Sequence, residues 1–276
     1  MSLSTLVGFL IGIGLFLSSV FLSTNNYWIF LNLPSLLLVM GGTLASAFIS
    51  YQSRYVWLSL KNVGRLFIEQ KVGRKTLNKE TGMTVRWGAV LKKGGLVALE
   101  KEIRSIQPPD PFLIFGLELV VSGYPGEEVR KMLSANIEST FERNMVQVDI
   151  LKSMAGTAPA FGMIGTLVGL IIMLETMGGG PEMLGKGMAV ALITTLYGVL
   201  LSRLIFLPAG AKAQQKEEIA RFRNYLLLEG FVMLAENRSP QFMVDKMNSF
   251  LDPAIQYRRK TLAQAQAPAP APATKK

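Results

Sequence analysis

The stretch APAFGMIGTLVGLIIMLETM, residues 158–177, decides the fold because it is apolar enough to lie inside a lipid bilayer. Its one charged residue, Glu175, stands near the far end, and a hydroxyl, Thr166, stands near the middle among small residues. A helix of roughly 20 apolar residues crosses a hydrocarbon core of about 30 Å. The chain has four stretches that meet this requirement, and they predict an all-α membrane protein with four transmembrane helices: residues 3–22, 28–49, 154–177 and 188–207.

The composition argues against an enzyme or a metalloprotein. Of the 276 residues, 50% are hydrophobic and 17% are charged, and neither cysteine nor histidine occurs. Disulfides and zinc-thiolate sites are therefore excluded, and the commonest general bases and activated nucleophiles are missing. We expect no catalytic residues, no cofactor and no resident metal. No basic region precedes residues 3–22, so we expect a membrane span there and not a cleaved signal peptide.

The basic residues predict the topology. Most of the 29 Lys and Arg residues lie between the second and third spans or after the fourth, whereas the two short connections are nearly free of them. By the positive-inside rule, the middle region, the tail and both termini are cytoplasmic. Acidic residues are interleaved with the basic ones, which argues against nucleic-acid binding.

The expected organisation has five parts. These are spans one and two (1–50), a helical cytoplasmic domain (51–153), spans three and four (154–210), a cytoplasmic helical region (211–262) and a disordered Ala-Pro tail (263–276).

Small and hydroxylated residues form one narrow face on each of the last two spans. Two interpretations of these faces stay open: close packing between helices, or a polar lining along a partner helix or an ion route. No Asp or Glu lies in the middle of any span, so a conducting assembly would need a carboxylate from another subunit. The residues are Ala155, Ala158, Gly162, Thr166 and Gly169 on the third span, and Ala191, Thr194 or Thr195, Gly198 and Ser202 on the fourth.

Three motifs resemble the MotA/PomA family of flagellar stator A-subunits: LPSLLLVMGG (33–42), APAFGMIGTLVGL (158–170) and AVALITTLYGVLLS (189–202). The resemblance covers residues 1–251. It implies a homopentamer in the bacterial inner membrane, around a dimer of a MotB/PomB-like B-subunit that supplies the transmembrane Asp. Ion flow would then drive the rotor protein FliG. The nearest alternative is an ExbB/TolQ-like energiser of outer-membrane transport, a class that typically has three spans.

The resemblance also implies roles for individual residues in the spans. Pro159 and Pro208 match the conformational prolines of the family, and Thr166, Thr194 and Thr195 match its ion-pathway positions. The GTL and TTLYG patterns are typical of sodium-type members. Because a hydroxyl oxygen is a hard ligand suited to Na⁺, we favour transient Na⁺ as the transported ion, with H⁺ as the alternative.

The segment KKGGLVALEKEI, residues 92–103, resembles the charged rotor-contacting segment of the family. Lys92 and Lys93 fit its basic positions and Glu100 its acidic position, although a solvated helix face is the alternative interpretation. Two residues depart from the family pattern. Lys101 replaces an acid found in some members, so the rotor charge pairs need not transfer. Asn32 stands where many members have Asp, which puts an accessory cation-attracting role in doubt.

Overall fold

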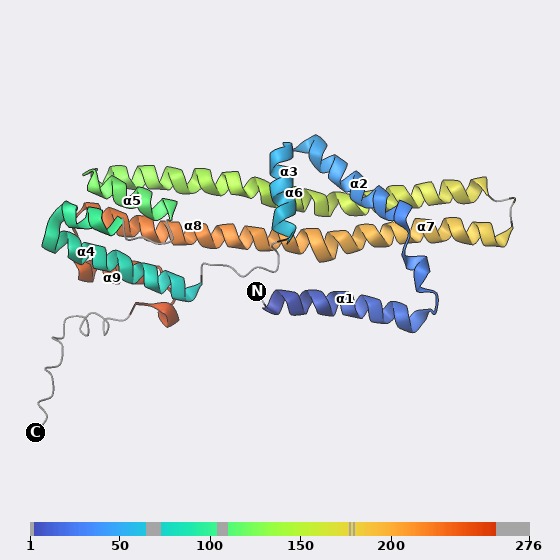
Figure 1. The fold of residues 1–276 in the computed structure, drawn as a ribbon, viewed down its shortest axis with the longest axis horizontal. Helices are drawn as coiled ribbons and strands as arrows, with labels where there is room; N and C mark the ends of the chain where they lie inside the picture. Colours follow the sequence, from blue (N-terminus) through green and yellow to red (C-terminus); the bar gives the residue numbers. More distant parts are fainter. Residues whose placement is uncertain (1–2, 65–72, 104–109, 177, 179, 258–276) are drawn as a thin grey trace, which may run out of the picture. The chain divides into compact units, whose positions relative to one another are not determined.

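The computed structural model describes residues 3–64, 73–103, 110–176, 178 and 180–257, and within these ranges it contains helices and no strand (Figure 1). The all-α prediction is therefore confirmed. The Ala-Pro tail, 263–276, lies outside the described residues. The elements are α1 (Leu3–Ser23), η1 (Tyr27–Phe30), α2 (Leu33–Ser50), α3 (Ser53–Gly64), α4 (Arg74–Ile103), α5 (Pro111–Val121), α6 (Gly126–Glu175), α7 (Pro181–Leu200), η3 (Leu201–Phe206), α8 (Leu207–Ala235), α9 (Pro240–Asn248) and η4 (Pro253–Ile255).

In the part of the chain that the structure describes, four helical segments are long and apolar enough to cross a membrane, which confirms the predicted number of spans. The first two are α1 and η1–α2, and the others lie within α6 and within the continuous helix formed by α7, η3 and α8. The last two helices extend well beyond the apolar stretches. The expected divisions at 153/154 and 210/211 therefore fall inside α6 and α8, because hydropathy changes there while the helix continues.

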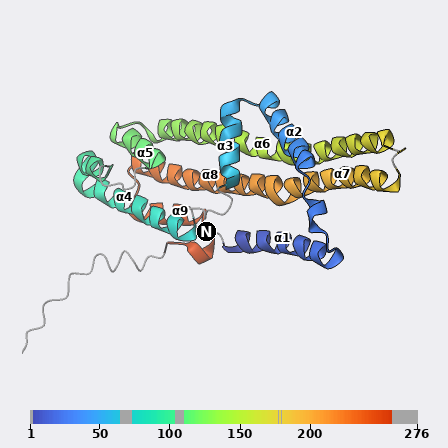
Figure 2. The same ribbon diagram turned by 45° about the vertical axis from the view of Figure 1, so that its right-hand side comes forward.

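The chain forms two compact units. The first contains Met1–Gln70 and Ser139–Ile219, and the second contains Lys71–Glu138 and Ala220–Lys276. In the first unit α2 packs against α7 (Figure 2). Its buried core joins α2, α3, α6, η3 and the start of α8, through residues that include Val39, Val56, Leu151, Phe206 and Ala209.

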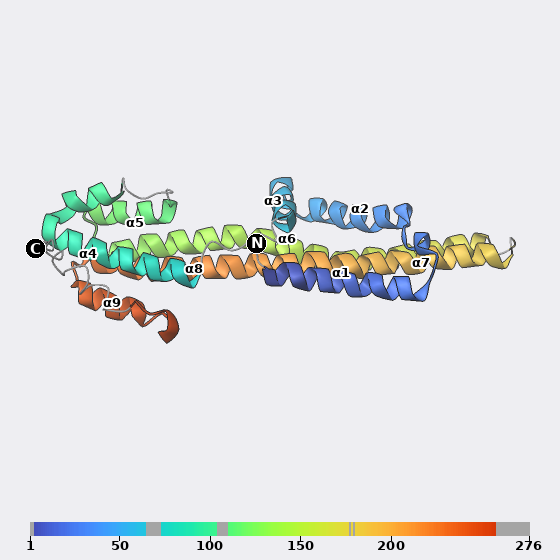
Figure 3. The same cartoon turned by 60° about the horizontal axis from the view of Figure 1, so that its bottom comes forward.

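The second unit is a small helical domain in which α4 packs against both α5 and α9 (Figure 3). Phe231 is fully buried at its centre, with the Trp87 ring stacked at a centroid distance of 6.2 Å. Gly116 lets α5 rest directly on that phenyl ring, because a Cβ at this position would lie 2.3 Å from a Phe231 ring carbon. The first turns of α6 and the second half of α8 complete the core.

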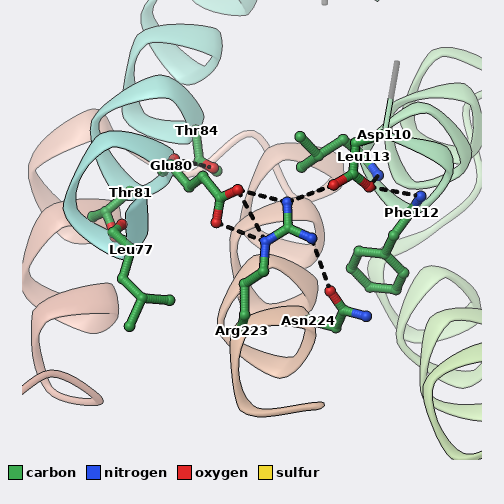
Figure 4. A network of polar contacts seen from close by, with 9 residues as sticks. All are labelled: Leu77, Glu80, Thr81, Thr84, Asp110, Phe112, Leu113, Arg223 and Asn224. Atoms are coloured by element: carbon green, nitrogen blue, oxygen red, sulfur yellow. Dashed lines mark hydrogen bonds and ion pairs between the residues drawn. The ribbon is translucent and has the colours of Figure 1, made fainter. Parts of the chain in front are cut away.

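A buried ion network ties three helices of this domain together (Figure 4). Arg223 on α8 donates to both carboxylate oxygens of Glu80 on α4, at 2.5 to 2.9 Å, and to Asp110 Oδ2 at 2.7 Å. The other oxygen of Asp110 accepts from the backbone amides of Phe112 and Leu113, and so caps α5. Burial acts to lower the pKa of Arg223, but the hydrogen bond and charge of Glu80 outweigh it and raise the pKa. The guanidinium therefore stays charged.

We expect Arg223→Met to destabilise the protein by about 3–5 kcal/mol, because it leaves the buried carboxylate of Glu80 and the partly buried carboxylate of Asp110 without their counter-charge. Thermal or denaturant unfolding of the purified protein in detergent measures this loss. Arg238→Met is the matched control, since Arg238 pairs with Glu236 at the surface, 2.8 Å apart, with half of its side chain exposed. The control should cost at most about 1 kcal/mol. Equal losses for the two variants would show that the network contributes no more than a surface pair.

Candidate functional site

The small faces of the last two spans pack against each other within one chain. A Cβ at Gly198 of α7 would lie 2.6 Å from the carbonyl oxygen of Ala158 on α6, and a Cβ at Gly169 would lie 2.8 Å from the backbone nitrogen of Ala191. The two backbones therefore touch along this line, which we call the α6–α7 seam. Close helix packing, one of the two interpretations left open by the sequence, is therefore observed here, and an ion route along the same surface stays a prediction.

Two predicted ion-pathway residues meet in the seam. Thr166 Oγ1 lies 2.5 Å from Thr195 Oγ1, and both hydroxyls lie 3.2 Å from the carbonyl oxygen of Gly162. Thr166 Oγ1 is also 3.2 Å from the carbonyl oxygen of Ala191. This hydroxyl pair, Thr166 and Thr195, thus gathers four oxygens, the atoms that bind hard cations. In the described part of the chain, no group of three or more His, Cys, Asp or Glu residues could hold a metal ion.

Thr194 lies apart from the hydroxyl pair. Its Oγ1 contacts the Ser35 hydroxyl of α2 at 2.9 Å and the Val190 carbonyl oxygen at 2.6 Å, and the residue is 1% exposed. Its methyl group fills the space that Gly165 leaves on α6, where an added Cβ would lie 2.0 Å away. The structure therefore brings Thr166 and Thr195 together and turns Thr194 toward α2. Ser35 was not singled out from the sequence, although it belongs to the LPSLLLVMGG motif.

Tyr197 holds the start of α2 in place. Its hydroxyl donates to the carbonyl oxygen of Phe30 at 2.5 Å and accepts from the backbone amide of Asn32 at 3.0 Å. The Asn32 side chain in turn accepts from the amide of Ser35 at 3.0 Å and caps the helix. Asn32, noted in the sequence as a departure from the family pattern, thus has a clear local role as an N-cap. Tyr197 was missed, although TTLYG contains it.

The two predicted conformational prolines interrupt helices without ending them. Pro159 lies inside α6, and Pro208 is the second residue of α8. The six residues Leu201–Phe206, directly before α8, form a π-helical turn. A proline has no backbone N–H, so each one withdraws a donor from the helix that contains it. Such breaks are tolerated in a membrane only where neighbouring groups satisfy the freed carbonyls.

The predicted rotor-contacting residues flank a sharp kink in α4. Gly95 has φ 66° and ψ −167°, a backbone conformation that interrupts the helix between the lysines and the acid. Lys92, Lys93 and Glu100 are all exposed. The spacing of eight residues between Lys92 and Glu100 therefore does not place them on one helical face. The Gly94-Gly95 pair was a visible signal for this break.

We expect Gly198→Ala to lower the melting temperature of the purified protein by several degrees, because the added methyl group meets a backbone oxygen that cannot move aside. Gly156→Ala on α6 is the matched control, since a Cβ there has no other atom within 4 Å. The control should melt at the same temperature or slightly higher, because alanine favours a helix over glycine. Equal melting temperatures for the two variants would contradict the close approach in the seam.

Comparison with known proteins identifies the family. A profile of the MotA/TolQ/ExbB proton channel family matches residues 104–224. The protein YtxD of Bacillus subtilis is 34% identical over 251 residues, 89% of each chain, and Motility protein A of Borreliella burgdorferi is 30% identical over 253 residues, 92% of this chain and 95% of its own. The flagellar MotAB stator complex of Bacillus subtilis has a chain of the same fold, with a TM-score of 0.80, 22% identity and coverage of 91% and 97%. The chain belongs to the MotA/TolQ/ExbB family.

Proposed function

We propose that this chain, together with a B-subunit, forms an ion channel that converts transmembrane ion flow into rotation of the flagellar motor. The observation that carries the proposal is the hydroxyl pair, which gathers four oxygens between two membrane-spanning helices that have no carboxylate in their middle. Oxygens of this kind ease a cation across the bilayer, but a transmembrane carboxylate must still balance its charge. The ExbB/TolQ alternative is not favoured, because Motility protein A of Borreliella burgdorferi is similar to this chain over 95% of its own length.

The proposed assembly is a homopentamer around a dimer of a MotB/PomB-like B-subunit in the bacterial inner membrane. On α6, the apolar side chains of Met163, Leu167 and Ile171 follow one another at helical spacing and are each more than 60% exposed in the single chain. Lipid or other subunits must cover this row. The positive-inside distribution of Lys and Arg supports cytoplasmic N- and C-termini.

We propose Na⁺ as the transported ion, because hard oxygen ligands suit Na⁺ and a proton needs only a carrier. Thr166 and Thr195 would supply the hydroxyl oxygens. Thr194 would act on them indirectly, because its hydroxyl lies against Ser35 and its methyl group supports α6 at Gly165.

The function is tested in a host that lacks its own stators and carries this chain with the B-subunit gene that neighbours it. We expect swimming to be restored and to slow strongly when Na⁺ is replaced by K⁺ at constant pH. We expect Thr166→Ala to raise the Na⁺ concentration that gives half-maximal speed, because it removes one oxygen of the hydroxyl pair. Non-motile cells would overturn the stator function. A swimming speed that does not depend on Na⁺ would overturn only the sodium coupling, and H⁺ would then be the proposed transported ion.

We further propose that Lys92, Lys93 and Glu100 contact the rotor protein FliG through the exposed kink of α4. We expect Glu100→Lys to weaken torque more than it weakens recruitment of stators to the motor. Torque is read from the speed of a tethered bead, and recruitment from the fluorescence of tagged stators. Glu118→Lys makes the same charge change at an exposed site on α5 and should affect neither quantity. Normal torque in the Glu100→Lys variant would show that Glu100 does not contribute to the proposed contact with FliG.

A further inference from the structure

Pro159 leaves one backbone carbonyl of α6 without its usual partner. In an α-helix, a carbonyl oxygen accepts from the backbone N–H four residues later. The carbonyl of Ala155 would therefore pair with residue 159, where proline has no N–H to give. Ala155 is only 6% exposed, so water is not readily at hand to replace the missing donor. A buried carbonyl in this position needs a donor from elsewhere.

Ser202 supplies that donor from the opposite helix. Its hydroxyl donates to the carbonyl oxygen of Ala155 at 2.6 Å, and the residue is 4% exposed. Most buried hydroxyls on the helices of this protein behave differently, because they donate to the carbonyl four residues earlier in their own helix, where a backbone N–H already serves the same oxygen. Examples are Thr43 to Val39, Thr81 to Leu77 and Thr84 to Glu80.

The local backbone holds Ser202 against α6. One turn earlier, Gly198 allows the two helices to touch at Ala158. Ser202 itself lies in the π-helical turn Leu201–Phe206, where the backbone amide of Leu207 bonds to the Ser202 carbonyl five residues before it. Such wide turns are often found at functional positions of helices. The short serine side chain reaches α6 because this part of the seam is so narrow.

We propose that Ser202 replaces the hydrogen bond that Pro159 removes, and that in doing so it keeps the Ala155 carbonyl from binding the conducted cation. The second half of this inference rests on the proposed channel function. A freed carbonyl oxygen is a strong hard ligand. Ala155 lies eleven residues before Thr166 on α6, about 16 Å along the same seam. A second oxygen site there would hold the cation after the hydroxyl pair has passed it on. Ser202 is thus a positioning residue for ion passage.

The structural half is tested by a double-mutant cycle on the purified chain in detergent. Ser202→Ala should lower the melting temperature by about 3 °C, because it leaves a buried carbonyl without a donor. In a Pro159→Ala background the residue at 159 regains its N–H, so the same substitution should cost almost nothing. Ser202→Thr keeps the hydroxyl and should therefore lose less stability than Ser202→Ala. An equal loss in both backgrounds would overturn the pairing of Ser202 with Pro159.

The functional half is tested in the stator-deleted host, with swimming speed measured over a range of Na⁺ at fixed pH and over a range of pH at fixed Na⁺. For the ion that drives swimming, Ser202→Ala should lower the half-saturating concentration by about fivefold and also lower the maximal speed, because the cation binds more tightly and leaves more slowly. In Ser202→Thr, which keeps the hydroxyl, the half-saturating concentration and the maximal speed should stay close to those of the unaltered chain. A loss of assembled stators would lower the speed and leave the half-saturating concentration unchanged.

Thr43→Val is the matched control, because it removes a buried hydroxyl that serves only its own helix, and it should shift neither quantity. An unchanged half-saturating concentration in Ser202→Ala would overturn the role in ion passage. If the unaltered chain does not restore swimming, the channel function falls together with this role. The double-mutant cycle then still decides whether Ser202 substitutes for the missing amide.

Discussion

The contact between the backbones of α6 and α7 is the constraint on which the rest of the membrane unit depends. Within a bilayer, helices gain little from burying apolar surface against each other, so close van der Waals contact and hydrogen bonds between them carry the association. Gly198 against Ala158 and Gly169 against Ala191 bring the two backbones into contact. Only at this separation can short side chains reach across. The hydroxyl pair can form only because the glycines let the two backbones approach this closely.

The contact between α6 and α7 also separates the features of the site that the sequence predicted from those that it did not. Span positions follow from local hydropathy, and the small faces follow from helical spacing, so both were predicted. Which of two adjacent threonines faces α6 was left open, because either fits the spacing of the small face. Successive residues point about 100° apart on a helix, so the two hydroxyls cannot occupy the same place in the seam. The Thr195 hydroxyl contacts Thr166 on α6, whereas the Thr194 hydroxyl contacts Ser35 on α2 and only its methyl group lies against α6. Which hydroxyl points toward α2 depends on where α2 lies in the fold, and no local sequence pattern gives that position.

The cytoplasmic domain shows the same division between local and non-local information. Its helical character was predicted; the kink at Gly95 was not, although the Gly94-Gly95 pair is a local signal for it. The network of Arg223, Glu80 and Asp110 was not, because its members come from three helices that are distant in sequence. Charged residues in a cytoplasmic segment are usually exposed to solvent, so nothing in the sequence singled out these three. A buried arginine with two carboxylates is recognised only when the fold brings them together.

On the proposed ion route, the oxygen atoms along the seam would also limit how strongly the chain can hold its ion. One elementary charge crossing 100 mV releases roughly 2.3 kcal/mol. A buried carbonyl without a donor is worth about 1–3 kcal/mol to whatever group satisfies it, which is the same scale. A route with unpaired carbonyls would therefore bind the cation with a free energy comparable to the free energy that the membrane potential supplies. In this chain the seam oxygens of Gly162, Ala191 and Ala155 each already contact a hydroxyl. Each of these hydrogen bonds lowers the affinity of the oxygen for a cation. A route built from partly satisfied oxygens binds the ion weakly enough for the membrane potential to move it onward.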